Sequence, residues 1–562
     1  MTAVEPALAE AIRRRQSGDW NRAAAICADI LARRPDDPAA LQMLGMMAFE
    51  AGRPDAALEL LRHAVAAAPG VARLWTDLGR VLRSQGCIRE ALECFRCAAE
   101  LEPQSAEAQN NVGNALRELG LAEQALAPLE RALELRPDFP EAVLNLAGVL
   151  EALGRLDEAA AHLSALLERN PDFAEARTNL GNLLARQGRL HEALRQLERA
   201  VRNKPGLAAA WNNLGAMHER LGDPERAIAC YREAVRLDPC FAEAHLNLGM
   251  ASLLLGRFQQ GWLEYEWRLR VPAAKPSRFS KPLWDGSGAQ GLRILLTCEQ
   301  GLGDAIQFVR YVPLLAERGA VVYLECHWRL APLLKSVRGL AGLVPAGSAP
   351  PSFDAHLPLM SLPRIFGTDL ETIPAEVPYL GVPPEQVARW RAWIEQRAGG
   401  LRVGLCWASN ASGKNAGVRS MQFKELAPLF GIPGIVFFSL QRGPGAAEIA
   451  QAPPGWRILD LEAEARGILD TAAAILSLDL VISVDTMVAH LAGALARPVW
   501  TLLPFAPDFR WLRDRTDSPW YPTMRLFRQP APGQWSELVE QVAGALAQWR
   551  ASSEVKRNAQ HG

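Results

Sequence analysis

Apolar positions recur with a helical period through the first 270 residues, and a longer period of 34 residues runs over them. A small residue, an alanine twelve residues later and a proline twelve residues after that mark this longer period. A small residue lets two helices approach closely, and a proline ends the second helix of a pair. The small residues are Gly45, Gly79, Gly113, Ala147, Gly181, Gly215 and Gly249, and the prolines that follow are Pro69, Pro103, Pro137, Pro171, Pro205 and Pro239.

The period predicts an α-solenoid over residues 1–270, made of about seven units and a degenerate capping unit. Its outline resembles the tetratricopeptide repeat. The last unit loses the alanine and the proline and contains Trp262, Tyr265 and Trp267 near helical spacing. We therefore expect a capping helix whose aromatic face docks on the next domain, and a ligand-stacking role is the alternative.

An amide series lies within the repeats, two residues before each small position. Equivalent positions of a solenoid stack in a row, and in the family that the repeats resemble this row faces the groove. A carboxamide offers both a donor and an acceptor, so such a row predicts a groove for an extended polypeptide. The alternative is that each amide bonds only within its own turn of the solenoid. The series is Asn111, Asn145, Asn179, Asn213 and Asn247.

After a linker rich in Pro, Ser and Gly, residues 271–290, the pattern changes to short apolar runs that alternate with helical stretches. This alternation predicts parallel sheets covered by helices, in two Rossmann-like lobes with a cleft between them. The lobes are residues 291–382 and 401–550, joined by an interlobe connection, 383–400, and a disordered tail follows at 551–562. The expected strands are 293–298, 321–326, 354–359, 402–407, 435–440, 480–484 and 498–503.

The stretch EQGLGDAIQF, residues 299–308, joins the first expected strand to its helix. Gly301 and Gly303 permit close backbone approach, and Asp304 stands near the start of the helix. Asp304 has two interpretations: a helix cap, or a carboxylate at the cleft that accepts a proton from an acceptor group. The turn is not G-x-G-x-x-G, which disfavours nicotinamide chemistry.

A second strand-end turn occurs in SVDTMVAHLAGALARPVW, residues 483–500. Asp485 and Thr486 end the strand, and His490 and Gly493 follow on one face of the next helix. A helix N-terminus suits a diphosphate, so these four residues are predicted to bind a nucleotide donor.

Two further loops at strand ends add candidate residues for binding the nucleotide donor. Lys414, Arg419 and Ser420 lie in the polar loop within 404–421, where cations would suit a phosphate, although a solvated surface loop explains them equally well. Gln441 follows another strand and is expected near the same edge of the sheet.

Bulk composition narrows the function classes. The net charge is −1, so no general attraction to nucleic acid is expected, and only seven of the 61 basic residues are lysine, so no single arginine stands out. Nine cysteines with no signal-peptide pattern indicate a cytoplasmic protein, and the longest apolar run is too short for a membrane span; peripheral membrane contact stays open. No Asp-x-Asp motif occurs, so neither a metal nor a cofactor is expected.

Together these motifs, with WASN…RS, SLQ and RWL…SPWYPTMRLFRQ, resemble those of bacterial tetratricopeptide-repeat glycosyltransferases. The second half is similar to the ADP-heptose:lipopolysaccharide heptosyltransferases, of GT-B fold, and the whole layout is similar to protein O-GlcNAc transferases. The resemblance implies metal-independent transfer of a sugar from a nucleoside diphosphate sugar to a protein or peptide acceptor. It also implies that Asp304 is the base and that the segment from Asp485 to Gly493 binds the donor. The alternatives are a non-catalytic scaffold and a transferase directed to a saccharide or lipopolysaccharide.

Overall fold

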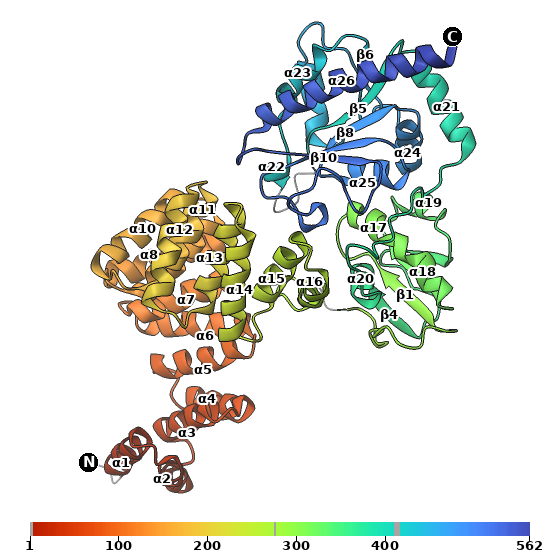
Figure 1. Cartoon of the computed structure of the whole chain (residues 1–562). Coiled ribbons are helices and arrows are strands. Elements are labelled where there is room, and N and C mark those ends of the chain that lie inside the picture. Colours follow the sequence, from red (N-terminus) through yellow and green to blue (C-terminus); the bar gives the residue numbers. More distant parts are fainter. Residues whose placement is uncertain (1–3, 275–276, 410–415, 562) are drawn as a thin grey trace. The chain divides into compact units, whose positions relative to one another are not determined.

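Antiparallel helix pairs fill the first part of the chain in this computed structural model, which describes residues 4–274, 277–409 and 416–561 (Figure 1). The chain falls into two compact units, residues 1–213 and 214–562. The helices of the array are α1 Val4–Gln16, α2 Trp20–Arg33, α3 Pro38–Glu50, α4 Pro54–Ala67, α5 Ala72–Ser84, α6 Ile88–Leu101, α7 Ala106–Glu118, α8 Ala122–Leu135, α9 Pro140–Ala152, α10 Leu156–Arg169, α11 Ala174–Arg186, α12 Leu190–Asn203, α13 Ala208–Arg220, α14 Pro224–Leu237, α15 Ala242–Leu254 and α16 Phe258–Tyr265.

The small residue of each unit is where its two helices touch. A Cβ added to Gly79 would lie 2.6 Å from Cε1 of Phe95, and one added to Gly113 would lie 2.4 Å from Cγ of Leu129. These side chains come from the second helix of the same unit, so a larger residue at either glycine would separate the pair. A solenoid over roughly the first 260 residues, as the period predicts, is confirmed.

A second glycine series, which the sequence analysis missed, forms the turn inside each pair. These residues have φ between +71° and +80°, a left-handed conformation that glycine adopts without steric cost. They are Gly18, Gly52, Gly86, Gly120, Gly154, Gly188, Gly222 and Gly256.

The boundary between the compact units lies inside the array, not at the linker 271–290, because the last helices pack on the region that follows. Trp262 of α16 donates a hydrogen bond from Nε1 to the carbonyl of Thr368 at 3.1 Å. Its ring lies edge-on to Phe308 and Phe509, with centroids 6.3 and 5.8 Å away. Residues 214–270 therefore belong structurally with the sheets.

Two fully parallel sheets make up the rest of the second unit (Figure 1). The first has the order β3-β2-β1-β4, and the second has the order β10-β9-β8-β5-β6-β7. The strands are β1 Arg293–Thr297, β2 Val321–Cys326, β3 Leu340–Pro345, β4 Ala355–Pro358, β5 Leu401–Cys406, β6 Ile435–Ser439, β7 Ile458–Asp460, β8 Leu480–Val484, β9 Val499–Leu503 and β10 Met524–Arg528.

Three strands, β3, β7 and β10, were not expected, and each lies at a sheet edge. Edge strands are partly solvated, so they lack the continuous apolar runs that mark central strands. β3 contains Gly342, β7 has three residues, and β10 carries Arg525 and Arg528.

Helices differ from the expectation in three places. The helix expected after the first strand is divided into α17 Leu302–Phe308, a 3₁₀ turn and α18 Val312–Glu317, with Pro313 in the first turn of α18. The interlobe connection 383–400 contains α21 Pro384–Glu395. The expected disordered tail is instead the end of α26 Trp535–His561, because no Gly or Pro interrupts residues 545–561. The other helices are α19 Ala331–Leu334, α20 Leu362–Ile365, α22 Ala416–Arg419, α23 Ala427–Phe430, α24 Ile468–Leu476 and α25 Met487–Ala494.

Each sheet has a switch point, where the strand order reverses. The chain passes from β1 outward to β3 and then adds β4 on the other side of β1; it likewise passes from β5 to β7 and then adds β8 beside β5. Ligands of open parallel sheets bind at the carboxyl ends of strands at such points. The turn after β1 carries Asp304, and the turn after β8 carries Asp485.

Candidate functional site

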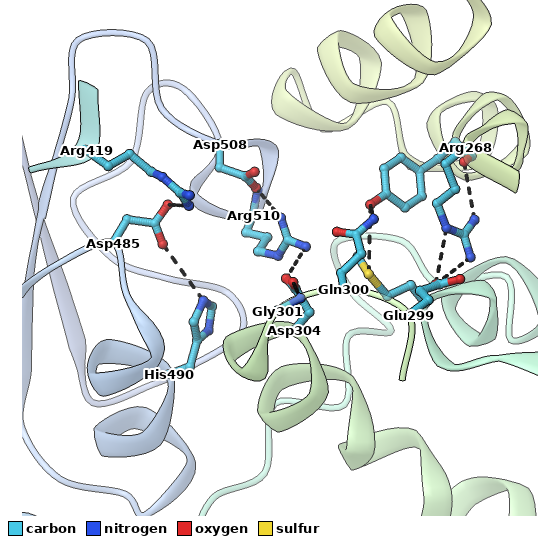
Figure 2. A network of polar contacts seen from close by, with 12 residues as sticks. Arg268, Glu299, Gln300, Gly301, Asp304, Arg419, Asp485, His490, Asp508 and Arg510 are labelled. Carbon is cyan, nitrogen blue, oxygen red and sulfur yellow. Dashed lines mark hydrogen bonds and ion pairs between the residues drawn. The ribbon is translucent and has the colours of Figure 1, made fainter. Parts of the chain in front are cut away.

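Arg510 pairs with Asp304, from the first switch point, and lies near enough to Asp485, from the second, to affect the pKa of that carboxyl (Figure 2). Arg510 belongs to η6, the 3₁₀ turn Phe509–Trp511, which follows β9. Its guanidinium Nη2 donates to Oδ1 of Asp304 at 2.5 Å, and its Nη1 donates to Oδ1 of Asp508 at 2.6 Å. An ion pair therefore joins the turn after β1 to the second sheet's side of the site.

Both oxygens of Asp304 are engaged. Oδ1 accepts from Arg510, and Oδ2 accepts from the backbone N–H of Gly301 at 2.8 Å, which caps the start of α17. The side chain is 20% exposed. Asp304 is thus both a helix-capping residue and an accessible carboxylate, so the two interpretations from the sequence are compatible.

Arg510 is held by charge within a buried setting, with a side chain only 7% exposed. Burial alone would lower the pKa of Arg510, but the carboxylates of Asp304 and Asp508 more than offset this, and its pKa lies above the usual value. The guanidinium is therefore a permanent cation at the centre of the site.

Asp485 lies within the same group of charges. Its Oδ2 is 3.4 Å from Nη1 of Arg419, and its Oδ1 is 3.9 Å from Nε2 of His490. Burial raises the pKa of the Asp485 carboxyl and the nearby Asp508 adds to this rise, while Arg419 and Arg510 oppose it. Asp485 thus lies between the cation Arg419 and the imidazole of His490.

His490 is a neutral, tightly packed imidazole. Burial lowers the pKa of His490 well below its usual value of 6.5, and the cations Arg510, Arg310 and Arg419 act in the same direction. Its Nδ1 lies 3.0 Å from the hydroxyl of Tyr521, and its ring stacks on Trp511. His490 therefore has partners on several sides within the protein.

Glycines let the two sheet regions approach at this point. A Cβ on Gly303 would lie 2.8 Å from Cδ2 of His490, so α17 can pack on α25 only because residue 303 has no side chain. A Cβ on Gly493 would lie 2.5 Å from Cδ1 of Tyr521. The space beside Gly493, which was predicted to help bind a nucleotide donor, is thus filled by Tyr521.

The other residues predicted to bind the nucleotide-sugar donor make bonds within the protein or lie outside the described residues. Thr486 is the N-cap of α25, where its Oγ1 accepts from the N–H of Val488 at 3.3 Å. The Oγ of Ser420 accepts from the N–H of Ser409 at 3.0 Å and so ties the loop after β5. Lys414 lies outside the described residues.

Gln441 uses its whole amide inside the protein. Its Oε1 accepts from the N–H groups of Trp407 and Ala408 at 3.0 and 2.9 Å, and its Nε2 donates to the carbonyls of Ala408 and Arg442. These four bonds fill the two donors and two acceptor sites of a carboxamide. Gln441 thus joins the ends of β5 and β6. Its amide has no group left for the predicted contact with a nucleotide-sugar donor.

The amide series lies on the first helix of successive units, on α7, α9, α11, α13 and α15. All five side chains are half-buried. Asn145 donates to Oδ1 of Asn110, a residue of the preceding unit, at 2.9 Å. Within the described ranges, Asn111 and Asn179 make no side-chain hydrogen bond, so their amides are available to a bound chain.

Arg510 and Asp508 were missed as site residues, although RWL was among the motifs quoted. An arginine-rich composition hid the signal, because no local pattern separates one buried arginine from its neighbours. Among the described residues four arginines have a buried Nε–H without a hydrogen-bond partner, and two of them, Arg419 and Arg510, belong to this site. Unpaired buried donors of this kind suit an anionic oxygen ligand.

Models of the tetratricopeptide repeat match residues 14–75, 70–138, 113–172, 144–208, 178–240 and 213–261. Residues 14–261 are an array of tetratricopeptide repeats. Among the described residues no helix has the length and apolarity needed to cross a bilayer, and no group of three or more His, Cys, Asp or Glu side chains could hold a metal ion.

Individual proteins show more limited likeness. The chain is 30% identical over 331 residues to Protein FlbA of Caulobacter vibrioides, a match that covers 53% of this chain and 54% of that protein. The chain thus spans about half the length of this curated relative. A tetratricopeptide repeat protein from Parabacteroides merdae (17% identity, TM-score 0.39) and YrrB, a protein with an unusual peptide-binding site (26% identity, TM-score 0.27), cover 44% and 33% of this chain and 97% and 96% of their own.

Proposed function

We propose that residues 214–562 form a metal-independent glycosyltransferase of GT-B type, which transfers a sugar from a nucleoside diphosphate sugar to a polypeptide held by the repeats. One observation carries the proposal: Asp304 pairs with the buried Arg510, and Asp485, which follows the switch-point strand of the other sheet, pairs with Arg419 and is influenced by the same Arg510. Structural packing alone does not require charged groups from two switch points to gather at one locus.

The charges at this locus suit the reaction. As the acceptor oxygen attacks the anomeric carbon, the bond to the diphosphate breaks and negative charge passes to the leaving group. Arg419, Arg510 and the N-terminus of α25 supply positive charge and N–H donors for it, and the unpaired Nε–H groups of the two arginines give it hydrogen bonds. Asp304 would accept the acceptor's proton as general base.

Arg510 also bears on when Asp304 can act. The guanidinium donates to Asp304 at 2.5 Å, which holds the carboxylate as an ion pair. A diphosphate within reach of Arg510 would compete for this guanidinium and leave Oδ1 of Asp304 open to the acceptor. Donor binding before acceptor deprotonation is therefore the expected order.

The acceptor is proposed from the amide series. Asn111 and Asn179 are half-buried and present free amides on first helices of the array, where a peptide backbone could pair with them. Such pairing reads the backbone rather than the sequence, so we expect a broad set of extended polypeptides.

A non-catalytic scaffold is the competing function, and one observation favours it: both oxygens of Asp304 and the whole amide of Gln441 are used inside the protein. A thermal-shift screen of the full chain against UDP-, GDP-, ADP- and dTDP-sugars separates the two. A transferase should be stabilised by one nucleotide class and should release that diphosphate with an acceptor peptide, and Arg419→Gln should weaken the shift. If no sugar nucleotide raises the melting temperature, the proposal fails.

A further inference from the structure

The turn that carries Asp304 is held from its other side by the last repeat unit (Figure 2). Arg268, just after α16, donates from both Nε and Nη2 to Oε1 of Glu299, at 3.2 and 2.9 Å. The hydroxyl of Tyr265, the last residue of α16, accepts from Nε2 of Gln300 at 3.1 Å. The two residues that precede the Gly301–Asp304 cap are therefore both fixed by the repeat array.

Arg268 is a rigid anchor. Its side chain is 5% exposed, and besides Glu299 it donates to Glu266 at 2.6 Å and to Ser361 at 2.8 Å. With a further bond to the carbonyl of Tyr265, the planar guanidinium makes five bonds to four partners, which leave its position little freedom. Glu299 is thereby held in place by a residue that directly follows the capping helix α16.

The same unit supports the partner of Asp304. The ring of Phe509, next to Arg510, lies 5.3 Å from the ring of Tyr265 and 5.8 Å from that of Trp262. Helix α15 also packs on η6, and α15 carries Asn247, the last amide of the series. One repeat unit thus contacts both the residues that precede the Asp304 cap and the turn η6 that contains Arg510.

We propose that Tyr265 and Arg268 are positioning residues, through which the last repeat unit sets the Asp304–Arg510 geometry. This inference rests on the proposed function for its catalytic consequence, and on the contacts alone for its structural part. A base placed within about half an ångström of its working position is a common requirement of catalysis, and the terminal repeat supplies that constraint here.

Full-chain Tyr265→Phe and Arg268→Lys test the positioning by hydrogen exchange of the peptide 299–308. Tyr265→Phe removes one hydroxyl from a buried ring, and Arg268→Lys keeps the charge but loses the fork that binds Glu299. We expect amide exchange in 299–308 to rise about fivefold or more in each, because the cap is no longer held from the repeat side. Trp267→Phe is the matched control: its ring stacks on His245 at 3.9 Å, within the same unit.

Activity gives the second readout. For a parent protein that transfers sugar, the two variants should lower kcat at least about tenfold while the donor KM stays within about twofold, and Trp267→Phe should change neither. A parent without transferase activity would refute the proposed function, and the exchange data would still decide the positioning. Unchanged exchange in 299–308 for Tyr265→Phe overturns it. Should Arg268→Lys exchange faster throughout the chain, Tyr265→Phe alone decides.

Discussion

Replacing Asp304 by asparagine separates its structural role from its proposed chemical role only if the charge of Arg510 is taken into account. The carboxylate accepts from Gly301 N–H and from Arg510 at the same time. An amide has one oxygen, so Asp304→Asn would turn an NH₂ group toward one of these two donors. The substitution has nearly the same shape, but it removes a charge and one of the two bonds.

The cost in stability follows from these contacts. Loss of one hydrogen bond to a charged group costs about 1.5–3 kcal/mol of stability. Asp508 still pairs with Arg510, so the cost stays below the ~3–5 kcal/mol of a buried charge left without a partner. We therefore expect Asp304→Asn to lower the free energy of unfolding by about 1–3 kcal/mol. If Asp304 is the base, the transfer rate should also fall by at least about a hundredfold.

Asp508→Asn is the matched control. Asp508 also pairs with Arg510, at 2.6 Å, and also caps its element, through the N–H of Arg510 at 3.1 Å. Both bonds to Asp508 end on Oδ1, so the amide oxygen of Asp508→Asn can keep them, and this variant should lose less stability in urea unfolding than Asp304→Asn. Donor affinity should be measured by calorimetry on both. The base hypothesis requires the rate of Asp304→Asn to lie far below that of Asp508→Asn. Equal rates would show that only the charge balance at Arg510 matters, and would refute the assignment.

Three further outcomes are expected. Gly303→Ala should lower the free energy of unfolding by about 1–3 kcal/mol, because its Cβ would meet His490 at 2.8 Å. Gly301→Ala is the control: its Cβ would meet only the Asp304 carboxylate, at 3.1 Å, so the free energy should change far less. Equal losses in urea unfolding would contradict this packing. The pKa of His490 is lowered on folding, so below about pH 6.5 the unfolded state binds more protons than the folded state. The free energy of unfolding should therefore fall from pH 7 to 5.5, and it should fall less in His490→Gln. Parallel stability curves for the parent and the variant would refute this. Asn111→Ala with Asn179→Ala should weaken capture of an extended polypeptide about fivefold for each lost bond without lowering the melting temperature, and undiminished binding would exclude the groove.

The sequence by itself determined the features that local or periodic patterns encode. The 34-residue period gives the solenoid, because each unit repeats the same short-range contact between a small residue and the helix that follows it, as at Gly113. The central strands were predicted because their apolar runs are buried on both faces. Asp304 and Asp485 were found because parallel strands place the residues after their ends at one edge.

Only the tertiary structure decided which of these residues act together and what each is paired with. Asp304 meets Arg510, which lies 206 residues away, and no period or local motif records a pairing at that distance. Likewise, only the tertiary packing places Tyr521 against Gly493 and lets the amide of Gln441 bond the end of β5. The division of the chain inside the repeat array has the same origin: the capping helix α16 buries Trp262 and Tyr265 against the sheet region, and this long-range burial outweighs the periodicity that assigned those residues to the repeats.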